Sequence, residues 1–161
     1  MTKSKQTVEE RLREQIELSE RRNLEEKAAL LNVLKERFGS DVINVVARMV
    51  AERAQKEWAE ISLKSQNNTI DDLIQLLWEP LRASGYEFTI DHRHDGVQVR
   101  CSVCPIYNMA RELGIVEWGY HFHCAKDPQV VEGFNPKIGF RRTKTLMEGY
   151  DCCDHFYYMK D

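Results

Sequence analysis

The sequence predicts an α+β fold, in which helices of the first half pack on a small antiparallel sheet formed by the second half. In residues 1–84, apolar side chains recur every three or four positions, which is typical of amphipathic helices. In residues 85–161, short segments alternate apolar and polar side chains, as strands with one buried face do. Helices and strands do not alternate along the chain, so a Rossmann-like sheet is not predicted.

The helical half contains three predicted helices, and residues 7–38 form the first, as one long helix or as two. Gly39 suits the backbone conformation that ends a helix, and Ser40 is expected to cap the second helix, which continues to Ile61. Thr69 is expected to cap the third helix. Proline lacks the backbone donor for the preceding turn, so Pro80 should kink or restart this helix before Gly85 ends it.

The second half contains two predicted strands joined by a polar turn over residues 92–96, then a helix and two more strands. The strands are expected at 86–91, 97–102, 138–145 and 156–159, and the helix at 107–113. We expect one domain over residues 1–161, with a helical part over 1–84 and the candidate site in the α+β part over 85–161.

Composition excludes several classes of protein. The net charge of -3 provides no general attraction to nucleic acid, and no apolar segment approaches the roughly 20 residues of a membrane helix. The polar first twenty residues do not resemble a secretory signal, so a cytoplasmic location is expected. The five cysteines are odd in number and include the adjacent pair Cys152-Cys153, which favours reduced thiols over a disulfide framework.

All cysteines and histidines lie in the second half, and eight of them form three short clusters: Cys101 and Cys104; His121, His123 and Cys124; Cys152, Cys153 and His155. Zinc prefers about four thiolate or imidazole ligands, and ligands two or three residues apart can reach one ion. A zinc ribbon repeats C-x-x-C at both ends, however, and this chain does not. The alternative is that the thiols are small buried apolar groups, above all Cys101 on its predicted strand.

Charged residues accompany these clusters. Asp127 follows Cys124 by three positions, Asp154 follows Cys153, and Arg141-Arg142 lie on a predicted strand. A guanidinium can hold a carboxylate through two parallel N–H bonds, as small amino-acid-like ligands require. Successive strand residues face opposite sides, so only one of the two arginines should face the site.

Five segments together resemble the L-2-amino-thiazoline-4-carboxylic acid hydrolase family: CPIYNMARELG at 104–114, CAKD at 124–127, EGFNPKI at 132–138, RTKT at 142–145 and GYDCCD at 149–154. The resemblance is clear over residues 86–158. It implies hydrolysis of a small cyclic substrate by addition of water to the ring carbon between nitrogen and sulfur. We expect a small-molecule substrate and no nucleotide cofactor.

The resemblance assigns roles to individual residues. It implies a catalytic group of Cys104, Cys124, Asp127, Cys153 and Asp154. It implies substrate contacts from Asn135, Arg142 and Thr143. Zinc or another divalent metal is an additional expectation, with the ligands Cys104, Cys124, Cys153 and His155.

Two departures from the family pattern put the identity of the substrate in question. The residue before the Cys153-Asp154 pair is more usually histidine and is Cys152 here, and the aromatic residue expected after the pair is His155. A relative acting on another small cyclic or carbamoyl compound is therefore an alternative. A non-enzymatic metal- or small-molecule-binding module is a second alternative, and a redox protein is a third. The amphipathic first helices could also form a homo-oligomer.

Overall fold

The computed structural model describes residues 7–161. The first half forms helices, and the second forms a four-stranded antiparallel sheet in the order β1-β2-β4-β3, which confirms the predicted α+β fold. The main helices are α1 (Val8–Phe38), α2 (Asp41–Ser62), α3 (Ile70–Leu77), α4 (Glu79–Ala83), α5 (Pro105–Glu112), α6 (Val116–Gly119) and α7 (Asp127–Phe134). A π-helix, η1 (Tyr120–Cys124), and a 3-10 helix, η2 (Leu146–Glu148), complete them. The first six residues of the expected helical part lie outside the described residues.

The helix boundaries mostly follow the sequence signals. Thr69 caps α3 with a reciprocal capping box to Asp72, because its hydroxyl accepts from the Asp72 N–H while the Asp72 carboxylate accepts from its own N–H. The helix restarts as α4 at Pro80, and Gly85 follows with a φ of 84°. The prediction for Ser40 is wrong, because this residue has helical dihedrals and its side chain caps nothing. Gly39 alone makes the turn between α1 and α2, with a φ of 84°.

The strands are β1 (Glu87–Arg93), β2 (Gly96–Val103), β3 (Ile138–Arg142) and β4 (Cys153–Met159). β3 ends three residues before the predicted limit, because the N–H groups of Thr143 and Lys144 bond to the Asp154 carboxylate instead of to a strand. β4 begins three residues earlier than predicted, and its first residue pairs with Cys101 of β2. Cys153, Asp154 and His155 therefore belong to the sheet.

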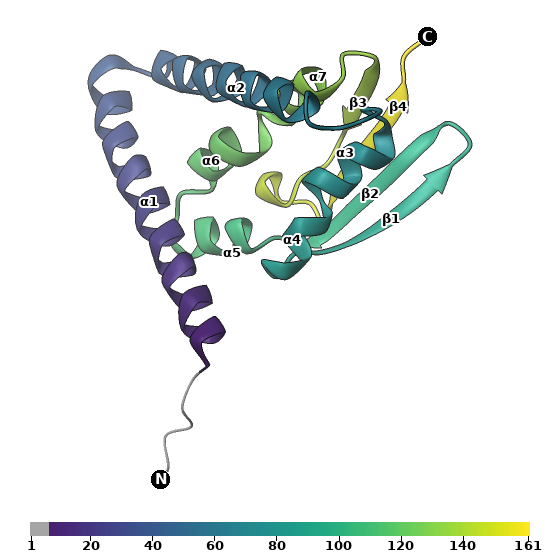
Figure 1. Cartoon of the computed structure of the whole chain (residues 1–161). Coiled ribbons are helices and arrows are strands. Elements are labelled where there is room, and N and C mark those ends of the chain that lie inside the picture. Colours follow the sequence, from purple (N-terminus) through teal and green to yellow (C-terminus); the bar gives the residue numbers. More distant parts are fainter. Residues whose placement is uncertain (1–6) are drawn as a thin grey trace.

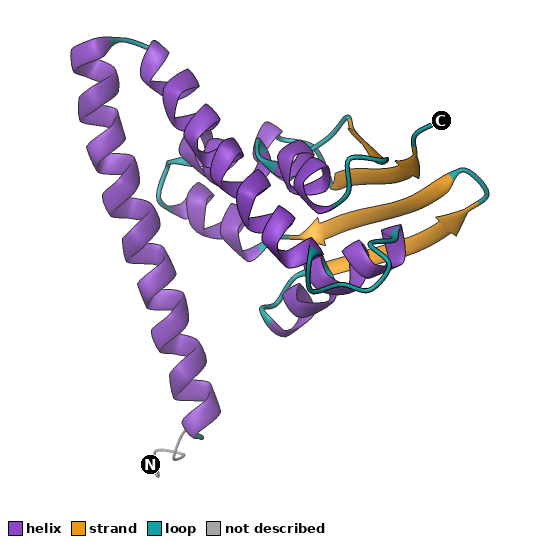
Figure 2. Ribbon diagram, turned by 45° about the horizontal axis from the view of Figure 1, so that its top comes forward, coloured by secondary structure: helices purple, strands orange, loops and turns teal. Residues whose placement is uncertain are grey.

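Helices cover one face of the sheet (Figures 1 and 2). Side chains of α3 and α7, including Leu73 and Phe134, pack with the inward residues of the strands, such as Val99 and Tyr157. α2 lies over α7, where a Cβ added to Gly133 would be 2.2 Å from the Gln55 carbonyl oxygen of α2. Glycine thus lets the backbones of α2 and α7 approach closely, and this packing fixes the start of α7 near the sheet.

The sequence did not predict α6, η1 or α7. Asp127 and Pro128 open α7, and an acidic residue and a proline in the first turn are ordinary signals of a helix start. Among residues 7–161, no helix is both long enough and apolar enough to cross a membrane.

Candidate functional site

Strand β4 carries three of the residues that face the covered side of the sheet. Side chains alternate along a strand, so Cys153, His155 and Tyr157 point toward the helices and Asp154 points away. His155 lies opposite Arg142 of β3 in the strand register. The same alternation turns Arg141 outward, over the ring of Phe156 at 5.0 Å, which confirms that only one of the two arginines faces inward.

A charged network connects β3, β4 and α7. Arg142 Nη1 donates to Asp127 Oδ2 and, at 3.0 Å, to the carbonyl oxygen of Cys124. His155 Nε2 lies 3.3 Å from the same Asp127 Oδ2. The side chains of Arg142 and His155 are only 9% and 8% exposed, and that of Asp127 is 24% exposed. Burial acts to lower the pKa of Arg142, but the Asp127 carboxylate raises it above its usual value, so the guanidinium is charged.

The π-helix η1 positions two of these groups. The N–H of Ala125 donates to the carbonyl oxygen of Tyr120 at 2.9 Å, a five-residue step that widens the turn. Cys124 ends η1, and Asp127 begins α7 after two intervening residues. His121 and His123 belong to η1, so they lie on a helix and do not share the face of an extended segment.

Four thiols lie around the network. Burial raises the pKa of Cys101 to about 12 and that of Cys153 to about 11, and the neighbouring thiols add to both shifts. The pKa of Cys104 and that of Cys124 are also raised, mainly by burial, and Asp127 adds to each shift. The Cys153 sulfur accepts from the Leu146 N–H at 3.2 Å, and that of Cys104 from the Tyr107 N–H at 3.4 Å. Burial therefore disfavours the thiolate form of these four cysteines.

Slow alkylation of the native thiols is the expected result of these shifts. The thiolate is the reactive form, and a pKa of about 11 in place of 9.0 reduces its fraction at Cys153 by about a hundredfold at pH 8. We expect iodoacetamide to modify Cys153 at least this much more slowly in the native protein than in urea, as measured by peptide mass spectrometry. Equal rates in the two states would contradict the buried, protonated thiol.

His155 has one ring nitrogen without a partner. In the tautomer that donates Nε2–H to Asp127, Nδ1 carries a lone pair, and this atom is buried with no hydrogen bond. The imidazole lies between the rings of Trp78 and Phe140, at 4.8 Å and 5.8 Å between centroids. A buried acceptor without a hydrogen bond costs free energy unless a water or a ligand donates to it, so Nδ1 is a candidate acceptor for such a group.

Three residues expected at the site have other partners. Asp154 accepts from the Thr143 N–H at 2.8 Å and from the Thr143 hydroxyl at 2.6 Å. Burial alone would raise the pKa of Asp154, but these bonds and one from Lys144 lower it below its usual value. Asn135 donates to the Asn68 carbonyl at 2.8 Å and accepts from the Lys137 N–H. These contacts fix loops, and they supply no group to the Arg142 network.

Metal binding finds no support in the arrangement of the side chains. Within residues 7–161, no three His, Cys, Asp or Glu side chains gather in a way that could hold a metal ion. The expected ligands Cys104, Cys124, Cys153 and His155 do not form such a group. The donor set does not fit zinc as arranged here, and no step proposed below depends on a metal.

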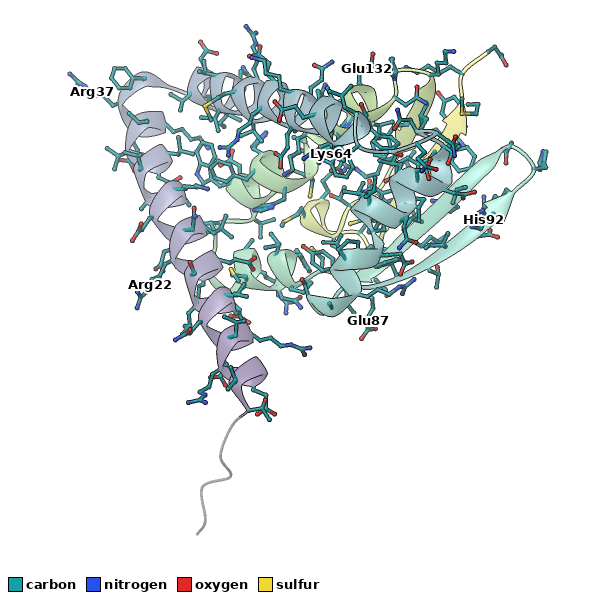
Figure 3. The ribbon with its side chains drawn as sticks, in the orientation of Figure 1. Arg22, Arg37, Lys64, Glu87, His92 and Glu132 are labelled. Carbon is teal, nitrogen blue, oxygen red and sulfur yellow. The ribbon has the colours of Figure 1, made fainter. Side chains whose placement is uncertain are left out.

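The remaining cysteines and histidines play smaller parts. The Cys152 sulfur lies 3.4 Å from the Arg100 guanidinium. Cys101 belongs to the apolar core, in agreement with the alternative that its thiol is a small buried apolar group. His121 lies beside the rings of Trp118 and Tyr120, and its buried Nδ1 is also unpartnered. Figure 3 shows His92 on the β1–β2 hairpin, where its Nδ1 lies 3.6 Å from the Asp71 carboxylate.

The sequence-based predictions missed three further residues of the site. The Tyr120 ring centroid lies 5.9 Å from the guanidinium carbon of Arg142, and Tyr120 contributes to the raised pKa of Arg142. The Tyr157 hydroxyl accepts from the Trp78 indole N–H at 2.9 Å. Tyr157 was detectable, because it follows His155 by two positions and so shares its face of β4. Trp78 comes from another part of the chain and has no local signature.

A hollow of about 410 Å³ lies on the other side of η1, between α1 and α2. We call it the α1–α2 hollow. Apolar residues line part of it, and Lys27, Arg53 and Lys126 supply three cations, none of which has a recorded ion pair with a carboxylate of residues 7–161. Glu20 and Glu57 also line it. His123 and Lys126 line the hollow, while Cys124 and Asp127, the residues after them, belong to the network.

Comparisons with known proteins identify the family. A model of the L-2-amino-thiazoline-4-carboxylic acid hydrolase family matches residues 17–157, which extends the resemblance into the helical half. No curated protein matches. Among solved structures, the phenol-responsive sensory domain of the transcription activator PoxR shares the fold, with 13% identity, a TM-score of 0.53, and coverage of 84% of this chain and 74% of that one. The family match covers most of the chain, and the chain belongs to the L-2-amino-thiazoline-4-carboxylic acid hydrolase family.

Proposed function

We propose that the protein hydrolyses a small cyclic compound of the 2-amino-thiazoline-4-carboxylate type, with His155 as the general base. The observation that carries the proposal is the buried pair of His155 and Asp127, in which Nε2 faces the carboxylate and Nδ1 has no partner. A carboxylate that is hydrogen-bonded to one imidazole nitrogen fixes the tautomer and makes the other nitrogen a better base. The family name supports the substrate class.

The proposed reaction uses one water and one proton transfer site on the protein. His155 Nδ1 takes a proton from water as the water oxygen forms a bond to the ring carbon between nitrogen and sulfur, and the π pair of the carbon–nitrogen double bond moves to the ring nitrogen. The proton of the added hydroxyl then moves to that nitrogen, the carbon–oxygen double bond forms, and the carbon–sulfur bond breaks with its electron pair on sulfur. The imidazolium returns the proton to that sulfur, which leaves N-carbamoyl-cysteine. Asp127 stabilises the imidazolium, and the ion pair with Arg142 holds the Asp127 carboxylate in place.

The neutral thiols of Cys104, Cys124 and Cys153 have a different role in this proposal from that of a nucleophile. Because their pKa values are raised, the thiols act as weak hydrogen-bond donors, and their polarisable sulfur atoms contact the substrate ring. The substrate carboxylate needs a cation, and Arg142 already uses Nη1 for Asp127 and Cys124. Its remaining N–H groups supply that contact.

Direct turnover tests the proposal. Purified protein is incubated with 2-amino-thiazoline-4-carboxylate, and mass spectrometry follows the gain of one water while a thiol reagent detects the new sulfhydryl after protein removal. We expect both signals to appear together and to depend on protein concentration. Binding of the compound, measured by calorimetry, without either signal would contradict the hydrolase and favour the second candidate below.

The second candidate is a module that binds a small ring compound without changing it. The rings of Trp78 and Phe140 beside His155 favour this function, since they give the site two aromatic walls. The PoxR domain, which shares the fold, is described as phenol-responsive. Calorimetry with phenol and with the thiazoline separates the two candidates, because only a binding module is expected to bind phenol and to leave both compounds unchanged.

A further inference from the structure

Helix α1 exposes a line of large apolar side chains on the face that points away from the rest of the molecule. Val8, Leu12, Ile16, Leu30 and Val33 are each between 51% and 74% exposed. Both ribbon views show the first half of α1 projecting beyond the body (Figures 1 and 2). Exposed apolar side chains are common singly, but five along one helix call for a partner surface.

The body fixes the direction of this face. Leu24, Ala28 and Leu31, on the other side of α1, are buried against α5, α6 and η2. The Trp118 indole donates to Asn32 at 2.6 Å, and Arg21 pairs with Glu112 at 2.8 Å. These contacts hold α1 on the body through its central and last turns. No rotation of the helix could bury the outer apolar side chains without breaking them.

The outer face has the spacing of a coiled-coil seam. Steps of four and three residues, in alternation, connect Leu12, Ile16, Ser19, Asn23, Glu26, Leu30 and Val33. Apolar residues occupy both ends of this seam and polar residues its centre. We call these seven residues the α1 seam.

We propose that the α1 seam binds the α1 seam of a second copy of the chain, with the two helices antiparallel. The seam has the same pattern read from either end: two apolar residues, three polar residues and two apolar residues. In an antiparallel pair with Asn23 opposite its counterpart, Ile16 lies opposite the second copy's Leu30, and Leu12 lies within one residue of the position opposite its Val33. Asn23 meets its own counterpart, so the polar centre pairs with a polar centre. The same patch serves both copies, as in an isologous two-fold interface.

Charges favour the antiparallel direction. A parallel pair would place Glu26 of the seam beside its counterpart, and this contact is repulsive. The antiparallel pair instead separates the two Glu26 residues by six positions, or about 9 Å at 1.5 Å rise per residue. Figure 3 shows Arg22 projecting from α1 into solvent.

Light scattering coupled to size exclusion tests the dimer. At micromolar concentration we expect twice the 18.9 kDa mass of the chain. The double variant Ile16→Glu, Leu30→Glu should elute as a monomer, because it places carboxylates opposite each other at both ends of the pair. The matched control is Val45→Glu, which adds a charge at a 68% exposed apolar residue of α2 outside the seam and should leave the dimer intact. A monomeric wild-type chain, or a dimeric double variant, would overturn the proposal.

Cross-linking tests the direction. A disulfide between two copies of Asn23→Cys is expected under mild oxidation, because Asn23 meets its counterpart. Two copies of Leu12→Cys should not cross-link, because the antiparallel pair separates them by about 33 Å at 1.5 Å rise per residue. The unsubstituted chain, which keeps its five native cysteines, is the control. Cross-linking through Leu12→Cys would overturn the antiparallel arrangement.

Discussion

Replacing His155 with phenylalanine is expected to lower kcat by about 10²–10⁴-fold, because a positioned general base contributes about this much to a proton-transfer step. The substitution preserves an aromatic ring between Trp78 and Phe140 and removes both nitrogens. Phenylalanine is close in size to the imidazole that it replaces, so the fold should tolerate the change. The measurement is the rate of N-carbamoyl-cysteine formation at saturating substrate.

His92→Phe is the matched control, since it makes the same chemical change on the exposed β1–β2 hairpin. It should retain the wild-type rate. Circular dichroism and the midpoint of urea unfolding establish that both variants fold. A His155→Phe variant that is folded and fully active would remove the histidine from the reaction and return attention to the thiols.

Replacing Arg142 with methionine is expected to lower the free energy of unfolding by about 3–5 kcal/mol, the usual cost of removing one partner from a buried ion pair. The substitution leaves the Asp127 carboxylate without its cation and the Cys124 carbonyl without its donor. Asp127 keeps 24% of its side chain exposed, so we expect a value near the lower end. Urea unfolding followed by tryptophan fluorescence provides the measurement.

Two further variants isolate the cause of that loss. Arg141→Met changes the neighbouring arginine on the exposed side of β3 and should alter the free energy of unfolding by no more than about 1 kcal/mol. The double variant Arg142→Met, Asp127→Leu removes both charges and should recover much of the loss, because an apolar pair of similar volume is often as stable as a buried ion pair. A single Arg142→Met variant as stable as the wild type would show that the pair contributes little.

Local signals in the sequence predicted the elements that depend on local chemistry. The Thr69 cap, the restart at Pro80 and the end at Gly85 are each decided by one residue and its near neighbours, and all three are confirmed. The prediction that Ser40 caps α2 was wrong, because the turn at Gly39 leads directly into α2 and no extended cap residue separates the helices. The predicted limits of β3 and β4 were wrong for a tertiary reason, since the Asp154 carboxylate accepts from backbone N–H groups eleven and ten residues away.

The candidate site was predicted in part. Arg142 and Asp127 form an ion pair, and Cys104, Cys124 and Cys153 lie close enough to Asp127 for its carboxylate to raise their pKa values; their roles stay a prediction. His155 was expected as a metal ligand, and its contact with Asp127 depends on where β4 begins. With the strand predicted to start at Phe156, the alternation that separates His155 from Asp154 was not visible. Protonation of the thiols was also hidden, because burial is a property of the folded chain.

The extra residue in the π-helical turn of η1 sets the rotational position, about the helix axis, of the residues that follow it. An ordinary α-helical turn over this segment would need one residue fewer, and each residue of an α-helix turns the chain by about 100°. Deleting one residue between Tyr120 and Cys124 would rotate Asp127 away from Arg142, even though every residue of the network was still present in the chain. Segment length is thus as much a requirement of this site as residue identity. Relatives that match its residues but differ in length here are expected to have lost its chemistry or to have acquired a different one.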